Sequence, residues 1–344
     1  MKVIMKKKIF KTLQYLAFFA IGVVLFWLVY RNMDMHKFKQ ELPHISLWWL
    51  ALSCVFSFLS HISRAIRWNM LIRPLGYKPR TINTFLSVLV MYLTNFIVPR
   101  AGELARCTVL GKYEKIPFTK LVGTVVIERA TDLVAMMVFA IGIIILQLPV
   151  FTKFLDVHPD VSAKLSSIFS TMHILVGLIL FFGFIGAVYA FRNKIKNSAL
   201  FQKVSHLYYN FTEGIRAIGK LEHKWRFIGH TVFIYLMWLL AMYVVFLSYP
   251  PTAHLSILTG MATFVMSGLA MIAPIQAGMG AWHFMVAATL LIYGIDIESG
   301  RTFALIAHTT TNLFLLVIGA IALIILPAVN RKLNRNETAE EGVQ

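Results

Sequence analysis

Long apolar runs dominate the sequence and predict an all-α, polytopic membrane protein. Six windows have the length and composition of transmembrane helices: residues 12–30, 45–63, 121–148, 169–191, 227–247 and 303–326. A helix needs about 20 apolar residues to cross roughly 30 Å of hydrocarbon. Basic, proline or glycine residues mark the ends of these windows. We therefore predict about six full spans in a helical bundle.

Two further apolar windows are interrupted by residues that break helices. Residues 81–98 run into Pro99-Arg100-Ala101-Gly102, and residues 256–293 contain Pro274, Gly278 and Gly280. Proline lacks a backbone donor and glycine weakens a helix. Non-helical backbone survives at membrane depth only where protein or a watery cavity satisfies it. The backbone at both breaks is therefore predicted to line a polar cavity.

Basic residues are unevenly distributed between the windows. Five, five, eight and three Lys or Arg lie, respectively, in residues 1–11, 64–80, 192–226 and 330–344. Three, two, none and one lie, respectively, in residues 31–44, 149–168, 248–256 and 294–302. Positively charged loops stay in the cytoplasm. The first group, with both termini, is therefore predicted to face the cytoplasm from an inner (cytoplasmic) membrane.

This assignment determines how the interrupted windows cross the membrane. The loops before and after each interrupted window lie on the predicted side of the membrane only if that window enters the membrane and returns to the same side. Residues 81–118 and residues 256–293 are therefore each predicted to form a re-entrant hairpin. The halves 45–148 and 227–326 then form an inverted repeat, an architecture of transporters. A single transmembrane domain, 12–328, would lie between a basic N-terminus, 1–11, and a polar tail, 329–344. The alternative makes 81–98 an ordinary span and places some later loops against the charge rule.

Composition narrows the function classes. Hydrophobic residues make up 58% of the 344, charged residues only 14%, and the formal net charge is +18. The basic residues lie in short loops, where they meet lipid head groups, so no nucleic-acid partner is predicted. The two cysteines, Cys54 and Cys107, offer no metal-ligand spacing. No catalytic or nucleotide-binding motif is present, so we predict neither an enzyme nor a metal or cofactor.

Charged residues in or beside the apolar windows are the strongest candidates for a functional site. Placing a charge at the bilayer centre costs about 3 kcal/mol or more, so such residues need partners. On a continuous helix Arg100, Glu103 and Arg106 would occupy adjoining faces at the first break. They indicate either a site for phosphate or another anionic head group, or an interfacial salt-bridged loop.

A second charged group lies inside the apolar window 121–148. Glu128 and Asp132 share a helical face, and Arg129 lies between them. Two carboxylates on one face repel unless a cation or proton joins them. This group indicates a counter-charge to the arginines, a proton relay, a contact to an amine-bearing head group, or a structural ion-pair network.

Other candidates carry weaker signals. Arg64 and Arg67, followed by Trp68, indicate either an anchor at the cytoplasmic face or a ligand contact. Asn95 lies one turn before Pro99. For His283, just after the second break, and for the pair His308 and Asn312, packing is favoured over ligand contact.

At these positions the sequence resembles the flippase-like membrane domain of lysylphosphatidylglycerol synthases, which also occurs as stand-alone proteins. The matching segments are Arg64–Trp68, Asn95–Arg106, Glu128–Leu133 and Pro274–Gly280, within a resemblance over roughly residues 10–330. The resemblance implies lipid translocation between leaflets. It also implies that the charged residues handle the head group: Arg100, Glu103, Arg106, Glu128, Arg129 and Asp132.

Two departures limit what the resemblance implies. The chain lacks the soluble aminoacyl-transferase domain of the full synthases, so it is not expected to aminoacylate lipid. Many relatives carry an acidic residue soon after the second break, where this chain has Ala281-Trp282-His283. The resemblance therefore does not imply which substrate this chain binds.

We predict a flippase-like transporter that binds the head group of a phospholipid or lipid-linked molecule in a polar cleft. Fixed counter-charges would lower the barrier to moving a charge through hydrocarbon. The alternatives are an ion- or proton-coupled carrier of a small polar solute, and a non-transporting accessory subunit of a lipid- or glycan-modifying enzyme. A membrane-embedded enzyme is a further alternative, for which Glu128 and Asp132 form the only suitable pair. A homo-oligomer and a partnership with a lipid-modifying enzyme both remain open.

Overall fold

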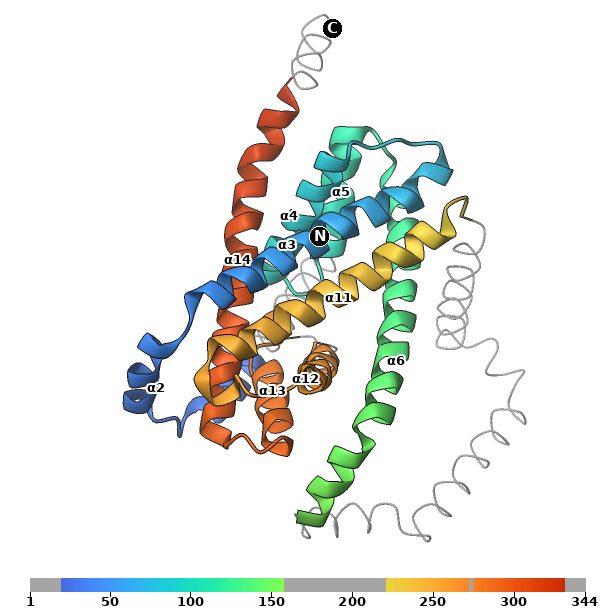
Figure 1. Ribbon diagram of the computed structural model, residues 1–344. Helices are drawn as coiled ribbons and strands as arrows, with labels where there is room; N and C mark the ends of the chain where they lie inside the picture. The colour runs from blue at the N-terminus through green and yellow to red at the C-terminus, as the bar shows by residue number, and fades with distance from the viewer. Residues whose placement is uncertain (1–19, 158–220, 272–274, 332–344) are drawn as a thin grey trace, which may run out of the picture.

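The computed structural model describes residues 20–157, 221–271 and 275–331, and these form a bundle of helices (Figure 1). Four helices in this part are long and apolar enough to cross a membrane: α3 (Leu47–Ile72), α6 (Phe118–Val157), α11 (Lys224–Ser248) and α14 (Ile297–Val329). They confirm four of the six predicted spans, and the chain is a multi-pass membrane protein. Of the window 12–30 only the helix Ala20–Tyr30 is described. The window 169–191, the N-terminus 1–11 and most of the tail 329–344 lie outside the described residues.

Helix α3 corrects one predicted boundary. The prediction ended the second span at residue 63 and assigned 64–80 to a loop, but the helix continues to Ile72. Arg64 and Arg67 are buried within it, because they meet carboxylates from a neighbouring helix instead of water. The connecting segment begins only at Arg73.

The first interrupted window forms a helical hairpin, α4 (Thr81–Ile97) and α5 (Gly102–Glu114). These helices have 17 and 13 residues, or roughly 26 and 20 Å at 1.5 Å per residue, which is less than the hydrocarbon thickness. At the base of the hairpin Asn83 Nδ2 donates to Glu114 Oε1 at 2.6 Å. The start of α4 and the end of α5 therefore lie together, and the chain returns to the side it came from.

The base of this hairpin is also fastened to the end of α14. Asn83 and Asn330 exchange side-chain amide hydrogen bonds of 3.0 and 2.9 Å. Arg80 donates to the same Asn330 oxygen and lies 3.4 Å from Glu114. Helix α14 packs along α4, so the two halves of the sequence are interlocked here.

The second interrupted window forms another pair of short helices, α12 (Ile257–Ala270) and α13 (Ala281–Ile292). A short 3-10 turn, Gln276–Gly278, lies in the break between them. The residues that flank the pair, Leu255 and Ile295, belong to one apolar cluster with Tyr249 at the end of α11. This hairpin therefore also returns to the side from which it enters.

The two hairpins enter from opposite sides. Helices α3 and α11 run antiparallel (Figure 1): Ser46 N donates to Ser248 O at 2.9 Å, and Ser63 Oγ lies 2.8 Å from His230 Nδ1. The base of the first hairpin follows the end of α3, whereas the base of the second follows the end of α11. The order of a long helix, a broken hairpin and a long helix thus repeats with inverted orientation, as predicted.

Candidate functional site

Seven charged side chains from three helices meet inside the bundle. They are contributed by α3, α5 and α6, and we call them the ion cluster: Arg64, Arg67, Glu103, Arg106, Glu128, Arg129 and Asp132. All but Arg64 and Arg67 come from the two charged groups that the sequence singled out. The break before α5 places Glu103 and Arg106 opposite Glu128 and Arg129 in the N-terminal third of α6.

Glu128 lies at the centre of the ion cluster. Its side chain has 0% exposure and meets all four arginines. Arg129 Nη2 and Arg106 Nη1 donate to its carboxylate at 2.7 and 2.9 Å. Arg64 Nε and Arg67 Nη2 approach it to 3.2 and 3.4 Å. A buried carboxylate in this setting is stabilised only by such partners.

Asp132 completes the shared face one turn further along α6. Arg67 Nη2 donates to Oδ1 at 2.6 Å, and Arg64 Nη2 donates to Oδ2 at 2.8 Å. Arg129 Nη2 lies 3.0 Å from Oδ2. The predicted common face of Glu128 and Asp132 is confirmed, and the arginines of α3 bridge the two carboxylates.

Helix α11 of the second half covers the cluster with neutral groups. Thr231 Oγ1 accepts from Arg67 Nη1 at 3.1 Å, and Tyr235 donates to the backbone oxygen of Asp132 at 2.6 Å. The Trp238 ring lies 5.1 Å from Arg64 Cζ. The cluster therefore lies at the junction of the two inverted halves. The sequence alone does not single out these three residues, because a Thr, Tyr or Trp in an apolar helix gives no distinctive signal.

Arg64, Arg67 and Trp68 do not form an anchor at the membrane surface. All three are buried. Arg64 Nη1 donates to Tyr92 Oη at 2.6 Å, and Trp68 Nε1 donates to Thr124 Oγ1 at 2.8 Å. The Trp68 ring lies under the Arg106 guanidinium, 4.4 Å from its Cζ. The surface-anchor interpretation of this motif was therefore wrong.

Glu103 and Arg129 form the accessible rim of the cluster. Their side chains are 26% and 40% exposed, compared with 13% for Asp132. Arg106 Nη2 lies 2.6 Å from Glu103 Oε2, and Arg129 Nη1 lies 3.4 Å from Oε1. This rim is therefore the part of the cluster that is most open to a molecule from outside the bundle.

Arg100 does not share a helical face with Glu103 and Arg106. It precedes α5, has a φ of +63° and is exposed. The helical spacing predicted for the three residues therefore fails, because the break turns the backbone before the helix begins.

Asn95 and Gly102 close the first break around Pro99. Asn95 Oδ1 accepts from Gly102 N at 2.8 Å, which satisfies one of the free donors at the start of α5. A Cβ on Gly102 would come within 2.2 Å of Met91 O. The close approach of α5 to α4 therefore requires glycine, and Asn95 has a structural contact here.

The second break is packed with aromatic rings. Gly280 has a φ of +79°, and its N–H donates to Nδ1 of the buried His283 at 3.2 Å. The His283 ring lies 5.3 Å from Phe26 and 4.3 Å from His308, centroid to centroid. His308 Nε2 lies 2.8 Å from Ala277 O, the residue before Gly278. These residues contribute nothing to the ion cluster, and Pro274 lies outside the described residues.

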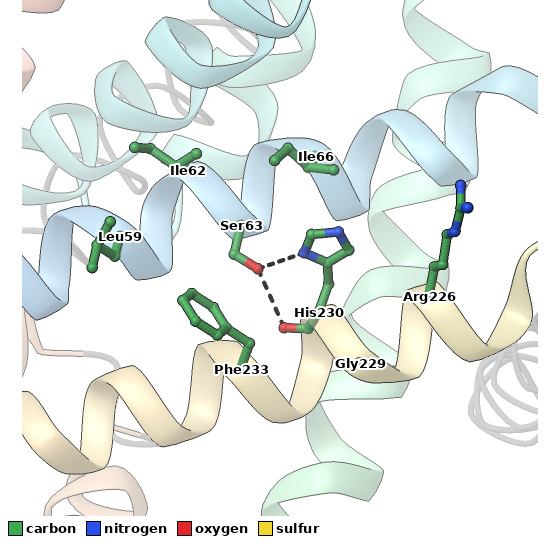
Figure 2. Close-up of a pocket in the computed structure, with 8 residues that line it drawn as sticks. All are labelled: Leu59, Ile62, Ser63, Ile66, Arg226, Gly229, His230 and Phe233. Atoms are coloured by element: carbon green, nitrogen blue, oxygen red, sulfur yellow. Dashed lines mark hydrogen bonds between the residues drawn. The ribbon is translucent and has the colours of Figure 1, made fainter.

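A groove of about 440 Å³ opens between α3 and α11 (Figure 2). Its walls are mostly apolar, with Ile62, Ile66 and Phe233 among them. Ser63 bonds His230 across it, and Arg226 lies at one end. None of the seven clustered side chains lines this groove.

Comparison with known proteins supports the resemblance. The family described as "Lysylphosphatidylglycerol synthase TM region" matches residues 15–319. A UPF0104 membrane protein of Methanocaldococcus jannaschii is 32% identical over 99 residues, which are 28% of this chain and 30% of that protein. The match thus spans less than a third of the relative. No solved structure matches the chain at a significant level.

Proposed function

This chain belongs to the family of the lysylphosphatidylglycerol synthase transmembrane region, and from that premise we propose that it moves a lipid with a charged head group between membrane leaflets. The head group binds at the ion cluster while the acyl chains stay in the surrounding lipid. In this proposal the protein acts as a transporter and not as an enzyme.

The observation that carries the proposal is the buried cluster of four arginines and three carboxylates in an apolar protein. Charged side chains within a membrane protein's apolar interior are energetically costly, and they are found mainly where ions or substrates pass. Here each clustered side chain has an opposite partner within 3.4 Å, and Arg129 is still 40% exposed. A charged head group that leaves water therefore meets counter-charges that are already in place.

The position of the cluster also supports transport. It lies between α3, α5 and α6 of one half, and α11 of the other half covers it. Inverted repeats expose a central site alternately by moving one half against the other. A shift of α11 along α3 would change the cover over Arg64 and Arg67.

The charge of the loops supports a cytoplasmic orientation for the end of α3. Arg73, Lys78 and Arg80 follow this end, and Lys224 and Arg226 begin the antiparallel α11 beside it. We propose that this side faces the cytoplasm and that the membrane is the inner one.

Flipping in vesicles tests the proposal. Purified protein is reconstituted in liposomes with a fluorescent phosphatidylglycerol analogue, and the fraction reduced by external dithionite is followed with time. We expect the wild type to expose the inner-leaflet probe and Arg129→Gln to slow this exposure at least tenfold. Lys112→Gln is the matched control, because Lys112 is an exposed cation on α5. Flipping by Arg129→Gln at the wild-type rate, or none by the wild type, would contradict the proposal.

The same vesicles separate the transporter from the alternatives. A solute carrier would accumulate a small polar solute without moving the lipid probe. An accessory subunit would move neither, and would co-purify with a stable enzyme partner.

A further inference from the structure

We propose that the Glu103 carboxylate is an internal placeholder for a lipid phosphate. In this proposal the phosphate of an anionic lipid displaces Glu103 from Arg129 and Arg106 when the lipid enters the cluster. The proposal rests on the proposed function and names the chemical class of its substrate.

Glu103 is the most loosely held acid of the cluster. Glu128 and Asp132 each accept aligned hydrogen bonds from at least two arginines. Glu103 Oε2 lies 2.6 Å from Arg106 Nη2, yet neither atom has a hydrogen-bond partner, because the N–H direction is unfavourable. Its other oxygen is 3.4 Å from Arg129 Nη1. Glu103 is thus held by charge and not by hydrogen-bond geometry.

The arginines retain donors for a better-fitting anion. Nε of Arg67, Arg106 and Arg129 has no hydrogen-bond partner, although all three atoms are buried. A buried donor without a partner costs about 1–3 kcal/mol. A guanidinium binds phosphate oxygens through a rigid fork of donors, and a phosphate offers more acceptor positions than one carboxylate. The exchange therefore improves the geometry around Arg106 and Arg129.

The charge of the cluster favours an anionic lipid over a zwitterionic one. Four guanidiniums face three carboxylates in the cluster, which leaves a formal excess of one positive charge. A phosphodiester that replaces Glu103 exchanges one negative charge for another, so the excess stays at one. A phosphomonoester carries about −1.5 to −2 at neutral pH and would nearly neutralise the cluster. A zwitterionic head group also brings an amine, so the excess would rise to two.

Displacement of Glu103 would also act on the first hairpin. Glu103 is carried by α5, whereas Arg129 is carried by α6. The contact between them therefore joins the tip of the hairpin to the long helix. A phosphate that replaces Glu103 on Arg129 removes this contact, so that head-group binding loosens the hairpin tip.

Binding measurements on the full-length protein in detergent test the exchange. Dioctanoyl phosphatidylglycerol is titrated into the wild type, Glu103→Gln and Arg129→Gln, and the dissociation constant is measured calorimetrically. Removal of the competing carboxylate should tighten binding by about fivefold or more, the lower end of typical coupling between two ligands. Arg129→Gln should weaken binding. If Glu103 were merely structural, both variants would bind more weakly.

Three further ligands and a control complete the design. Dioctanoyl phosphatidylcholine should bind more weakly than phosphatidylglycerol, and phosphatidic acid should bind at least as tightly. Equal or tighter binding of phosphatidylcholine, or weaker binding of phosphatidic acid, would refute the charge argument. Inorganic phosphate distinguishes a free anion from a lipid, and equal affinity for it would overturn the lipid assignment. Glu298→Gln is the charge-matched control, because Glu298 lies in the first turn of α14. Its affinity should equal that of the wild type.

The outcomes separate this proposal from the proposed function. If vesicles show flipping but Glu103→Gln does not tighten binding, the placeholder is wrong and transport stands. If Glu103→Gln tightens binding but the wild type moves no lipid, the binding site stands and transport is wrong. Unfolding temperatures near the wild-type value establish that each variant is folded.

Discussion

The two broken hairpins occupy equivalent places in the inverted repeat but hold different chemistry. The first brings Glu103 and Arg106 against the charged face of α6. The second buries His283 among aromatic rings. Each break uses one side chain to satisfy one backbone donor, Asn95 for Gly102 and His283 for Gly280.

This difference distinguishes the residues that form the helix breaks from the residues that form the candidate site. The shared feature, a side chain that bonds a glycine N–H, is what a helix break needs in a medium without water. The ion cluster is built on only one half, and the other half covers it through α11. We therefore expect changes at the first hairpin to alter both stability and transport, and changes at the second to act mainly on stability.

The largest effect is expected from Glu128→Gln, at the centre of the first half. It leaves four arginines facing two carboxylates, and breaking a buried ion pair from one side costs about 3–5 kcal/mol. We expect a markedly lower unfolding temperature in detergent and no lipid flipping. Because the variant is less stable, less of it should accumulate in the membrane than of the wild type. An unfolding temperature equal to that of the wild type would show that the cluster contributes little to stability.

Glycine-to-alanine changes at the two breaks should have the next largest effect. A Cβ would lie 2.2 Å from Met91 O at Gly102 and 2.6 Å from Phe26 N at Gly280. Because backbone must move in both cases, each variant should lose roughly 1–3 kcal/mol. The control is Gly123→Ala in α6, where a Cβ meets nothing within 4 Å. Thermal unfolding measures all three, and an unchanged Gly102→Ala would refute the tight α4–α5 approach.

Asn95→Ala should have a moderate effect. It removes the acceptor for Gly102 N, and loss of a helix cap costs about 1 kcal/mol. Because the cap positions Glu103 and Arg106, flipping in liposomes should slow as well. Asn95→Asp retains the acceptor and should restore most of the stability. Full flipping by Asn95→Ala, at reduced stability, would show that the break does not position the cluster.

Tyr92→Phe should have the smallest effect. It removes one neutral acceptor from Arg64, which keeps its carboxylate partners Glu128 and Asp132. A hydrogen bond to a charged group contributes about 1.5–3 kcal/mol at most, and the remaining partners reduce the loss. We expect a small fall in unfolding temperature with flipping within twofold of the wild type. A loss as large as that of Glu128→Gln would place Tyr92 in the site itself.

Periodicity and charge counting predicted most of the architecture. Apolar length located four long helices, and proline and glycine located both breaks. The sequence could not locate the end of α3, because Arg64 and Arg67 look like loop residues until their partners on α6 are known. Local sequence records a charge but not the carboxylate that lies opposite it in space.

The candidate site was predicted in part. The spacing of Glu128 and Asp132 indicated one face with arginines as its counter-charges, and the structure joins that face to Arg106 and Arg129. Arg100 was misplaced on the helical face, because a break changes the direction in which each following side chain points. The contributions of Thr231 and Trp238 depend on how α11 packs, which residue type alone does not encode.

The amide contacts between Asn83 and Asn330 bear on how the first hairpin bends. They fasten its base to the last turn of α14, and Glu114 brings the returning helix to the same point. A helical hairpin that is held at its base moves most at its far end. Thermal energy and ligands alike should therefore displace residues 98–101 far more than residues 80–83.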